Sequence, residues 1–174
     1  MSYVPSHQTG ISLAQPVALT VIVHSTSTTQ SITSGNRIQI GTVHNWYGSF
    51  SPTISTNQIT LVSGYYYYIE SMINLYMSSG FSAGSYCSFQ HYDETGSANI
   101  GTPATVFQAA EEDNQLYSQD SCARLLVDCT SAAKDISLKV GTNSGSFDRI
   151  NYSGGNQNYS GYGRTVIWQL ESAP

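Results

Sequence analysis

Short segments in which apolar and polar residues alternate recur along the 174 residues, and this period of two constrains the fold more than any other feature. Clusters of Gly, Ser, Asn and Pro divide the segments, which is the spacing of a sandwich or barrel. Helical periodicity is nearly absent, and the one candidate for a helical turn lies within 107–117. Roughly eight to ten strands without a crossover helix predict an all-β antiparallel sandwich, and a jelly roll is the commonest such fold at this length.

The chain divides into two predicted parts. Residues 1–16 hold two prolines and no periodicity, so we interpret them as an extended N-terminal arm; a frayed terminus is the alternative. Residues 17–174 form the predicted jelly-roll domain. Its strands are expected within 17–23, 36–46, 57–64, 65–77, 121–130, 134–145 and 163–172, with a hairpin over 84–102 that turns at Glu94 to Asn99.

Charge and hydropathy exclude several classes of protein. Only 10% of the residues are charged, against about 25% in an average soluble domain. The net charge is −5 and the six basic residues are scattered singly, whereas a nucleic-acid footprint needs clustered Lys and Arg. No segment approaches the ~20 apolar residues of a membrane helix, and the N-terminus lacks the basic region of a signal peptide. We therefore expect no nucleic-acid or membrane partner and synthesis in a cytoplasm.

Catalytic and metal-binding patterns are weak. The four histidines do not stand at metal-ligand spacing, and HExxH and GxSxG are absent. The sequence therefore predicts no enzyme and no cofactor. The acidic cluster Glu111, Glu112 and Asp113 is a weak calcium candidate, and a solvated loop is the commoner explanation. The three cysteines lack CxxC spacing and are interpreted as small buried apolar residues.

The tyrosine-rich strand at 65–77 is unusual because both of its faces are largely apolar. The odd positions, from Tyr65 to Met77, make a good core face. The even positions combine tyrosine and methionine with Glu70 and Asn74, a mixture typical of a protein–protein interface. We therefore predict that the odd positions face the core. The even positions are predicted to form a subunit interface through Tyr66, Tyr68, Glu70 and Met72. The alternative is a central strand in a thick monomeric core.

Residues 17–171 resemble the C1q/TNF-like jelly-roll family. The resemblance rests on the N-terminal strand VALTVIVHS, on GYYYYIESMINLY with its Gly-x-Tyr match at Gly64 and Tyr66, and on the closing segment SGYGRTVIWQLE. In that family the aromatic strand lies at a trimer axis, so the resemblance implies a homotrimer. The family's Gly-x-Tyr tyrosine usually faces the core, which would require a bulge near Ile69 and Glu70 to agree with the parity given above.

Members of this size without a collagen repeat or membrane anchor resemble phage structural proteins. The resemblance thus implies a virion protein, namely a trimeric capsid decoration protein of a tailed phage that binds the major capsid protein or another virion protein. The arm would supply Tyr3, Val4, Ile11 and Leu13 to that contact. The alternative is a glycan-binding module at a fibre tip, which is less favoured because 16 residues cannot form a trimeric stalk.

The segment 151–163 repeats NYSG and is rich in Tyr, Asn, Ser and Gly, which is the composition of adaptable recognition loops. A glycan is its candidate ligand, and a plain connecting loop remains an equal interpretation. The candidate recognition residues are Asn151, Tyr152, Asn158, Tyr159 and Tyr162.

Overall fold

The structure is a computed structural model that describes residues 16–24, 30–76, 85–107, 116–117, 121–144, 147, 149–150 and 163–171. These residues contain strands, turns and irregular segments but no helix. Accordingly, the part described offers no helix with the length and apolar character needed to cross a membrane.

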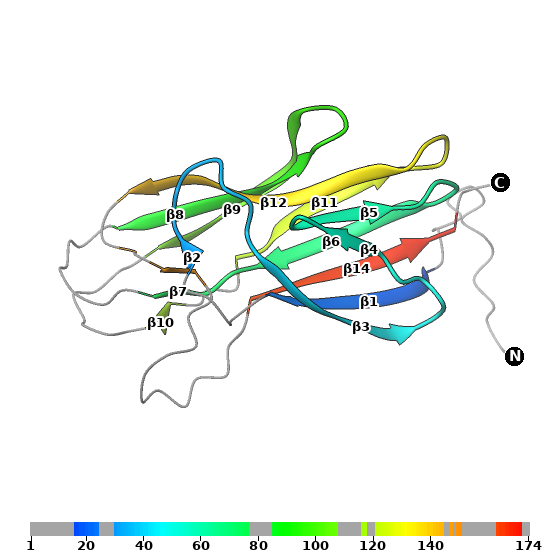
Figure 1. Cartoon of the computed structure of the whole chain (residues 1–174), viewed down its shortest axis with the longest axis horizontal. Coiled ribbons are helices and arrows are strands. Elements are labelled where there is room, and N and C mark those ends of the chain that lie inside the picture. Colours follow the sequence, from blue (N-terminus) through cyan, green and yellow to red (C-terminus); the bar gives the residue numbers. More distant parts are fainter. Residues whose placement is uncertain are drawn as a thin grey trace, which may run out of the picture.

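Ten strands form the main antiparallel sheet, in the order β3-β1-β14-β6-β11-β9-β8-β12-β5-β4 (Figure 1). They are β1 (Pro16–His24), β3 (Ile40–Tyr47), β4 (Thr53–Ser55), β5 (Gln58–Leu61), β6 (Tyr66–Met72), β8 (Tyr86–Asp93), β9 (Ala98–Phe107), β11 (Ala123–Asp128), β12 (Lys134–Ser144) and β14 (Arg164–Leu170). A second sheet of two-residue strands has the order β10-β7-β13-β2. Its members are β2 (Gln30–Ser31), β7 (Leu75–Tyr76), β10 (Leu116–Tyr117) and β13 (Arg149–Ile150).

The ten-stranded sheet folds into two layers around one interior. The first layer is β3-β1-β14-β6-β11 and the second is β9-β8-β12-β5-β4. Buried residues of both layers share the same two apolar clusters: Ile69 and Ile167 of the first layer group with Ile59 and Ile136 of the second. The predicted all-β antiparallel sandwich of the jelly-roll type is therefore confirmed.

The two layers join where β9 meets β11 through the single pair of Arg124 with Thr102. Gly101 stands beside this pair with a φ of 71°, in the left-handed region that favours glycine. A Cβ on Gly101 would lie 2.2 Å from the carbonyl oxygen of Arg124. Glycine therefore permits β11 to approach β9 at the corner of the sandwich.

The odd positions of β6 face the core, as predicted. Tyr67, Ile69 and Ser71 are buried, whereas the four even residues of the strand are half-buried. The pairing of β6 with β11 and with β14 runs without a register shift. No bulge near Ile69 and Glu70 interrupts this pairing, and Tyr66 is half-buried on the outer side, so the core-facing tyrosine that the family resemblance implied is not found. In a strand without a bulge, a core-facing Tyr66 would also bury the Glu70 carboxylate.

Strand β4 was not predicted. It pairs with β5 through a two-residue turn at Thr56 and Asn57, both with positive φ. Turns of this kind usually carry Asn-Gly or Asp-Gly, and the β-branched Thr56 conceals the signal. Each of the other long strands overlaps a predicted segment, but β9 continues to Phe107, five residues beyond the predicted end of the hairpin at 102.

Candidate interaction surfaces

The outer face of the first layer is more apolar than its inner face along two strands. In β1 the outward residues are Val17, Leu19, Val21 and Val23, whereas the inward ones include the polar Thr20 and His24. In β14 the outward residues are Val166, Trp168 and Leu170, and the inward ones are Thr165, Ile167 and Gln169. A sheet with one face in water normally shows the opposite distribution. This outer face, hereafter the apolar face, therefore has the composition of a covered surface.

The four predicted interface residues lie in the middle of the apolar face. Tyr68 stands opposite Trp168 of β14 and Leu126 of β11, and the rings of Tyr68 and Trp168 are 5.4 Å apart. Leu126 is 66% exposed, whereas Tyr68 opposite to it is half-buried. The structure thus places Tyr66, Tyr68, Glu70 and Met72 on one surface together with apolar residues of three further strands, and their role as an interface stays a prediction.

Charge on the apolar face is balanced within the face itself. The Tyr68 hydroxyl donates to Glu70 Oε1 at 2.8 Å, and Arg124 Nε lies 3.0 Å from the same oxygen. Partial burial, followed by the hydrogen bond to Glu70, raises the pKa of Tyr68. Arg164 and Asp128 lie at the ends of neighbouring strands, so the described face carries two charges of each sign.

The other predicted site residues lie outside the described residues. These are the calcium candidates Glu111, Glu112 and Asp113, the arm residues Tyr3, Val4, Ile11 and Leu13, and the loop residues Asn151, Tyr152, Asn158, Tyr159 and Tyr162. Within the part of the chain that the structure describes, no three His, Cys, Asp or Glu side chains gather as a metal site would require.

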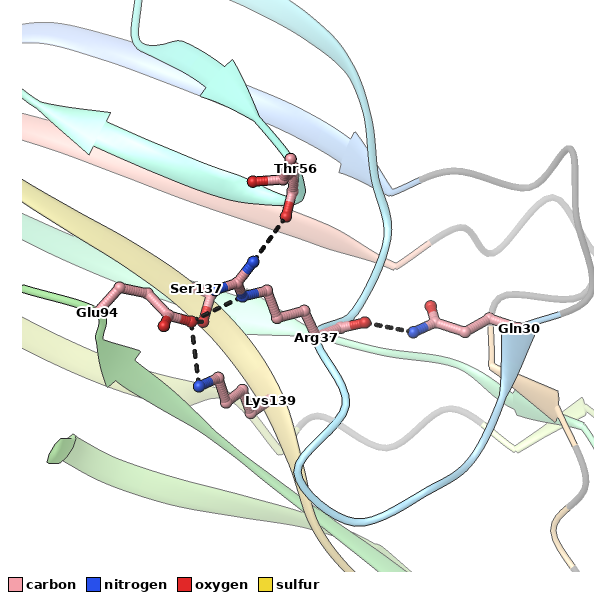
Figure 2. A network of polar contacts seen from close by, with 6 residues as sticks. All are labelled: Gln30, Arg37, Thr56, Glu94, Ser137 and Lys139. Carbon is pink, nitrogen blue, oxygen red and sulfur yellow. Dashed lines mark hydrogen bonds and ion pairs between the residues drawn. The ribbon is translucent and has the colours of Figure 1, made fainter. Parts of the chain in front are cut away.

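A polar cluster lies on the second layer, on the side opposite to the apolar face (Figure 2). Glu94 is its centre: Oε1 lies 2.8 Å from Arg37 Nε, 3.1 Å from Lys139 Nζ and 2.6 Å from Ser137 Oγ. The Arg37 hydrogen bond is the main reason that the pKa of Glu94 falls to about 2. Glu94 is thus an ionised anchor for two cations and is not a solvated turn residue.

The segment before β3 brings Arg37 to this cluster. Arg37 forms an isolated antiparallel bridge with Lys139 of β12, and the amide of Ile38 donates to the carbonyl of Leu138 at 2.8 Å. Gln30 fixes the same segment, because its Nε2 donates to the Arg37 carbonyl at 2.5 Å and its Oε1 accepts from the Gln39 amide at 2.8 Å. Arg37 Nη1 also donates to the Thr56 carbonyl at 3.2 Å.

A cleft of about 610 Å³ opens beside the cluster, hereafter the polar cleft. Its lining is Gln30, Gly35, Asn36, Arg37, Gln39, Thr56, Asn57 and Lys139. A second hollow of about 370 Å³ adjoins it at Gly35 and Lys139 and adds Gln90, Tyr92 and Asn99. Lys139 Nζ lies 3.2 Å from the centre of the Tyr92 ring, so this cation is held on two sides.

A buried chain of hydrogen bonds connects the two layers through the core. His24 Nε2 lies 2.9 Å from Thr165 Oγ1, which is 2.8 Å from Ser71 Oγ, and Ser71 Oγ is 2.9 Å from His91 Nε2. All four side chains are buried. His91 and Ser71 are each 1% exposed, and His91 Nδ1 has no hydrogen-bond partner within the part described. The hydroxyl and imidazole are therefore sealed from substrate and have no orienting carboxylate of the kind found in a hydrolytic triad.

Sequence reasoning found the apolar face and missed the polar cluster and the buried chain. Residues 37, 94 and 139 are far apart in the sequence, and no local pattern marks them as partners. The histidines carry no local signal, because His24 and His91 are linked only through Thr165 and Ser71 of two other strands. One signal was present: Thr20, His24, Thr165 and Gln169 occupy the less apolar parity of strands whose other parity is strongly apolar.

The three cysteines are thiols, and two of them are buried. Burial raises the pKa of Cys87 to about 12 and that of Cys129 to about 11. Cys122 is half-buried, so the interpretation of all three as buried residues is wrong for this one. Cys122 lies at the start of β11, beside the corner of the sandwich, where fewer residues cover it.

We expect a thiol reagent to label one cysteine per folded chain and three after denaturation, because thiolate formation and access both favour Cys122. Mass spectrometry of the labelled peptides identifies the position. Rapid labelling of Cys87 in the folded protein would contradict its burial.

Comparisons with models of known protein families and with curated proteins found no match to this chain.

Proposed function

We propose that this protein is a non-enzymatic structural subunit that assembles as a homotrimer through the apolar face. The observation that carries the proposal is the inverted distribution of β1 and β14, in which more apolar residues point away from the core than toward it. Burying a fully exposed side chain of this kind is worth about 1.5–3 kcal/mol. These side chains are half-buried in the single chain, so each gains only the part that corresponds to its remaining exposed area. An apolar face that extends over four strands would also favour uncontrolled aggregation if it stayed in water.

Further copies of the same chain are the partners that the charges favour. The chain has a net charge of −5, so two copies repel one another over most of their surfaces. The apolar face does not add to this repulsion, because Glu70 and Arg124 neutralise each other within it. Tyrosine and tryptophan at its centre are typical of the core of an interface. The resemblance to the C1q/TNF-like family, with its aromatic strand at the axis, adds the expectation of three copies.

In the role that the resemblance favours, the trimer is a capsid decoration protein of a tailed phage. It would be made in the host cytoplasm and bind the major capsid protein or another virion protein as part of the virion. The N-terminal arm, through Tyr3, Val4, Ile11 and Leu13, would be the contact with that partner. Three arms on one trimer bind together, and such avidity raises affinity by roughly 10²–10⁴ without new contacts.

Light scattering on the purified chain tests the assembly. We expect a mass three times the 18.8 kDa of one chain at micromolar concentration. A monomer at that concentration would contradict the proposal, and a dimer would restrict the apolar face to a two-fold contact.

A second candidate function is a receptor-binding module at a fibre tip, with a glycan as its ligand. The polar cleft favours it, because amide, hydroxyl and charged groups line a hollow on the side opposite to the apolar face. A trimer formed through the apolar face would leave this cleft open to solvent.

A further inference from the structure

The residues that line the polar cleft are held in place by hydrogen bonds and ion pairs within the protein. Gln30 and the Thr56–Asn57 turn hold its two sides: Gln30 bonds the backbone at Arg37 and Gln39, and Asn57 Oδ1 accepts from the Ile40 amide at 3.1 Å. Arg37 and Lys139 are both fixed by Glu94. The cations are thus held in place before any ligand arrives, which lowers the entropic cost of binding.

The charge of the cleft is opposite to that of the chain. Arg37 and Lys139 supply two positive charges, and Glu94 supplies one negative charge. The pKa of Glu94, about 2, keeps this carboxylate ionised at neutral pH. The cleft therefore carries one net positive charge in a chain whose net charge is −5, so it attracts an anion of low charge.

The hydrogen-bonding groups of the lining suit a polyol. Arg37 uses Nε and Nη1 within the protein, and Nη2 has no hydrogen-bond partner among the described residues. The Asn36 side chain and Nδ2 of Asn57 are further donors on the cleft wall. The adjoining hollow adds Gln90 and Asn99. A phosphate site would instead concentrate several cations or backbone amides on one small anion.

We propose that the polar cleft binds a carboxylate-bearing saccharide. The carboxylate would lie against Arg37 Nη2 and the Lys139 ammonium, and the sugar hydroxyls would lie against Asn36, Asn57 and the adjoining hollow. This inference rests on the second candidate function and not on the homotrimer, because the lining of the cleft contains none of the residues that form the apolar face.

Isothermal titration of the full chain at low ionic strength tests the proposal. The acidic probes are 3′-sialyllactose and trigalacturonate, which distinguish a sialic acid from a uronic acid, and the neutral counterparts are lactose and α-1,4-galactotriose. We expect at least one acidic probe to bind about tenfold or more tightly than its neutral counterpart. Lys139→Gln is expected to weaken that binding about tenfold or more.

Lys134→Gln is the matched control, because Lys134 lies on the same strand but pairs with Asp93 and is not part of the cleft lining. It should change the affinity by less than about twofold. Asn36→Ala is a second variant at an exposed position, expected to weaken binding about threefold if Lys139→Gln fails to fold.

Three results would overturn the inference: no binding of either acidic probe, equal binding of inorganic phosphate, or equal losses in Lys139→Gln and Lys134→Gln. The mass of the same sample is measured in parallel. A trimer that binds no saccharide would refute saccharide binding at the polar cleft but not the homotrimer. A monomer that binds an acidic probe would refute the homotrimer but not saccharide binding at the polar cleft.

Discussion

Replacing Leu126 with aspartate is expected to convert the trimer into a folded monomer. Leu126 is 66% exposed in the single chain, so the substitution should cost the monomer only a few tenths of a kcal/mol. In the assembled face the new carboxylate would be buried between Arg124 and Asp128 on the same strand, and the Arg124 guanidinium is already paired with Glu70. Burying such an unpaired charge costs several kcal/mol, and three-fold symmetry repeats the cost at every interface.

Light scattering should give a mass near 18.8 kDa for Leu126→Asp, with a circular dichroism spectrum like that of the wild type. Tyr68→Asp at the neighbouring position should have the same effect on mass. Val62→Asp is the matched control, because Val62 is also an exposed apolar residue but lies outside the strands of the first layer. A Leu126→Asp variant that remained trimeric would show that the apolar face is not the interface.

The period of two predicted most of the fold because the pattern is local. In β6 the odd positions could be assigned to the core since only that choice keeps Glu70 out of it. The same pattern could not say which face of β14 is inward, because Val166, Trp168 and Leu170 are a good core set when read alone. Their outward direction is decided by the neighbouring strands, which no single segment encodes.

The polar cluster could not be predicted because Arg37, Glu94 and Lys139 meet only after parts of the chain that are far apart in the sequence have paired. Glu94 belongs to the turn after β8, and the sequence around it is that of an ordinary polar turn. Lys139 is one of several polar residues on the outward parity of its segment, together with Asp135, Ser137 and Asn143. Their contact with Arg37 depends on the antiparallel pairing of residues 35–38 with β12, which hydrophobic periodicity does not describe.

The folded protein is expected to lose stability steeply below about pH 6.5 because of His24 and His91. Burial lowers the pKa of His24 to about 3 and that of His91 to about 4, from 6.5. The unfolded chain therefore binds protons that the folded chain does not, and the free energy of unfolding falls as the pH decreases from about 6.5. Each histidine contributes roughly 2 kcal/mol of loss by pH 5, or about 4 kcal/mol together.

Urea unfolding at fixed protein concentration between pH 7.5 and 5 measures this loss. The pKa of Glu94 is lowered from 4.5 to about 2, so its effect on stability falls below this pH range and does not interfere with the measurement. His91→Gln keeps a hydrogen-bonding partner for Ser71 but cannot titrate, so it should remove about half of the pH dependence. Equal slopes in the wild type and His91→Gln would contradict the assignment.

The direction of the hydrogen bonds explains why the buried chain of hydrogen bonds from His24 to His91 cannot take up a further proton. Its three bonds require three hydrogens, and the hydroxyls of Ser71 and Thr165 supply two, so one histidine must donate from Nε2. We assign that role to His91, because the opposite tautomer would leave a buried N–H at its unpartnered Nδ1. His24 then accepts at Nε2. A proton added to His24 removes the acceptor at the end of the chain, and a proton added to His91 creates the orphan N–H. Acid therefore disrupts the contact between the layers at either end.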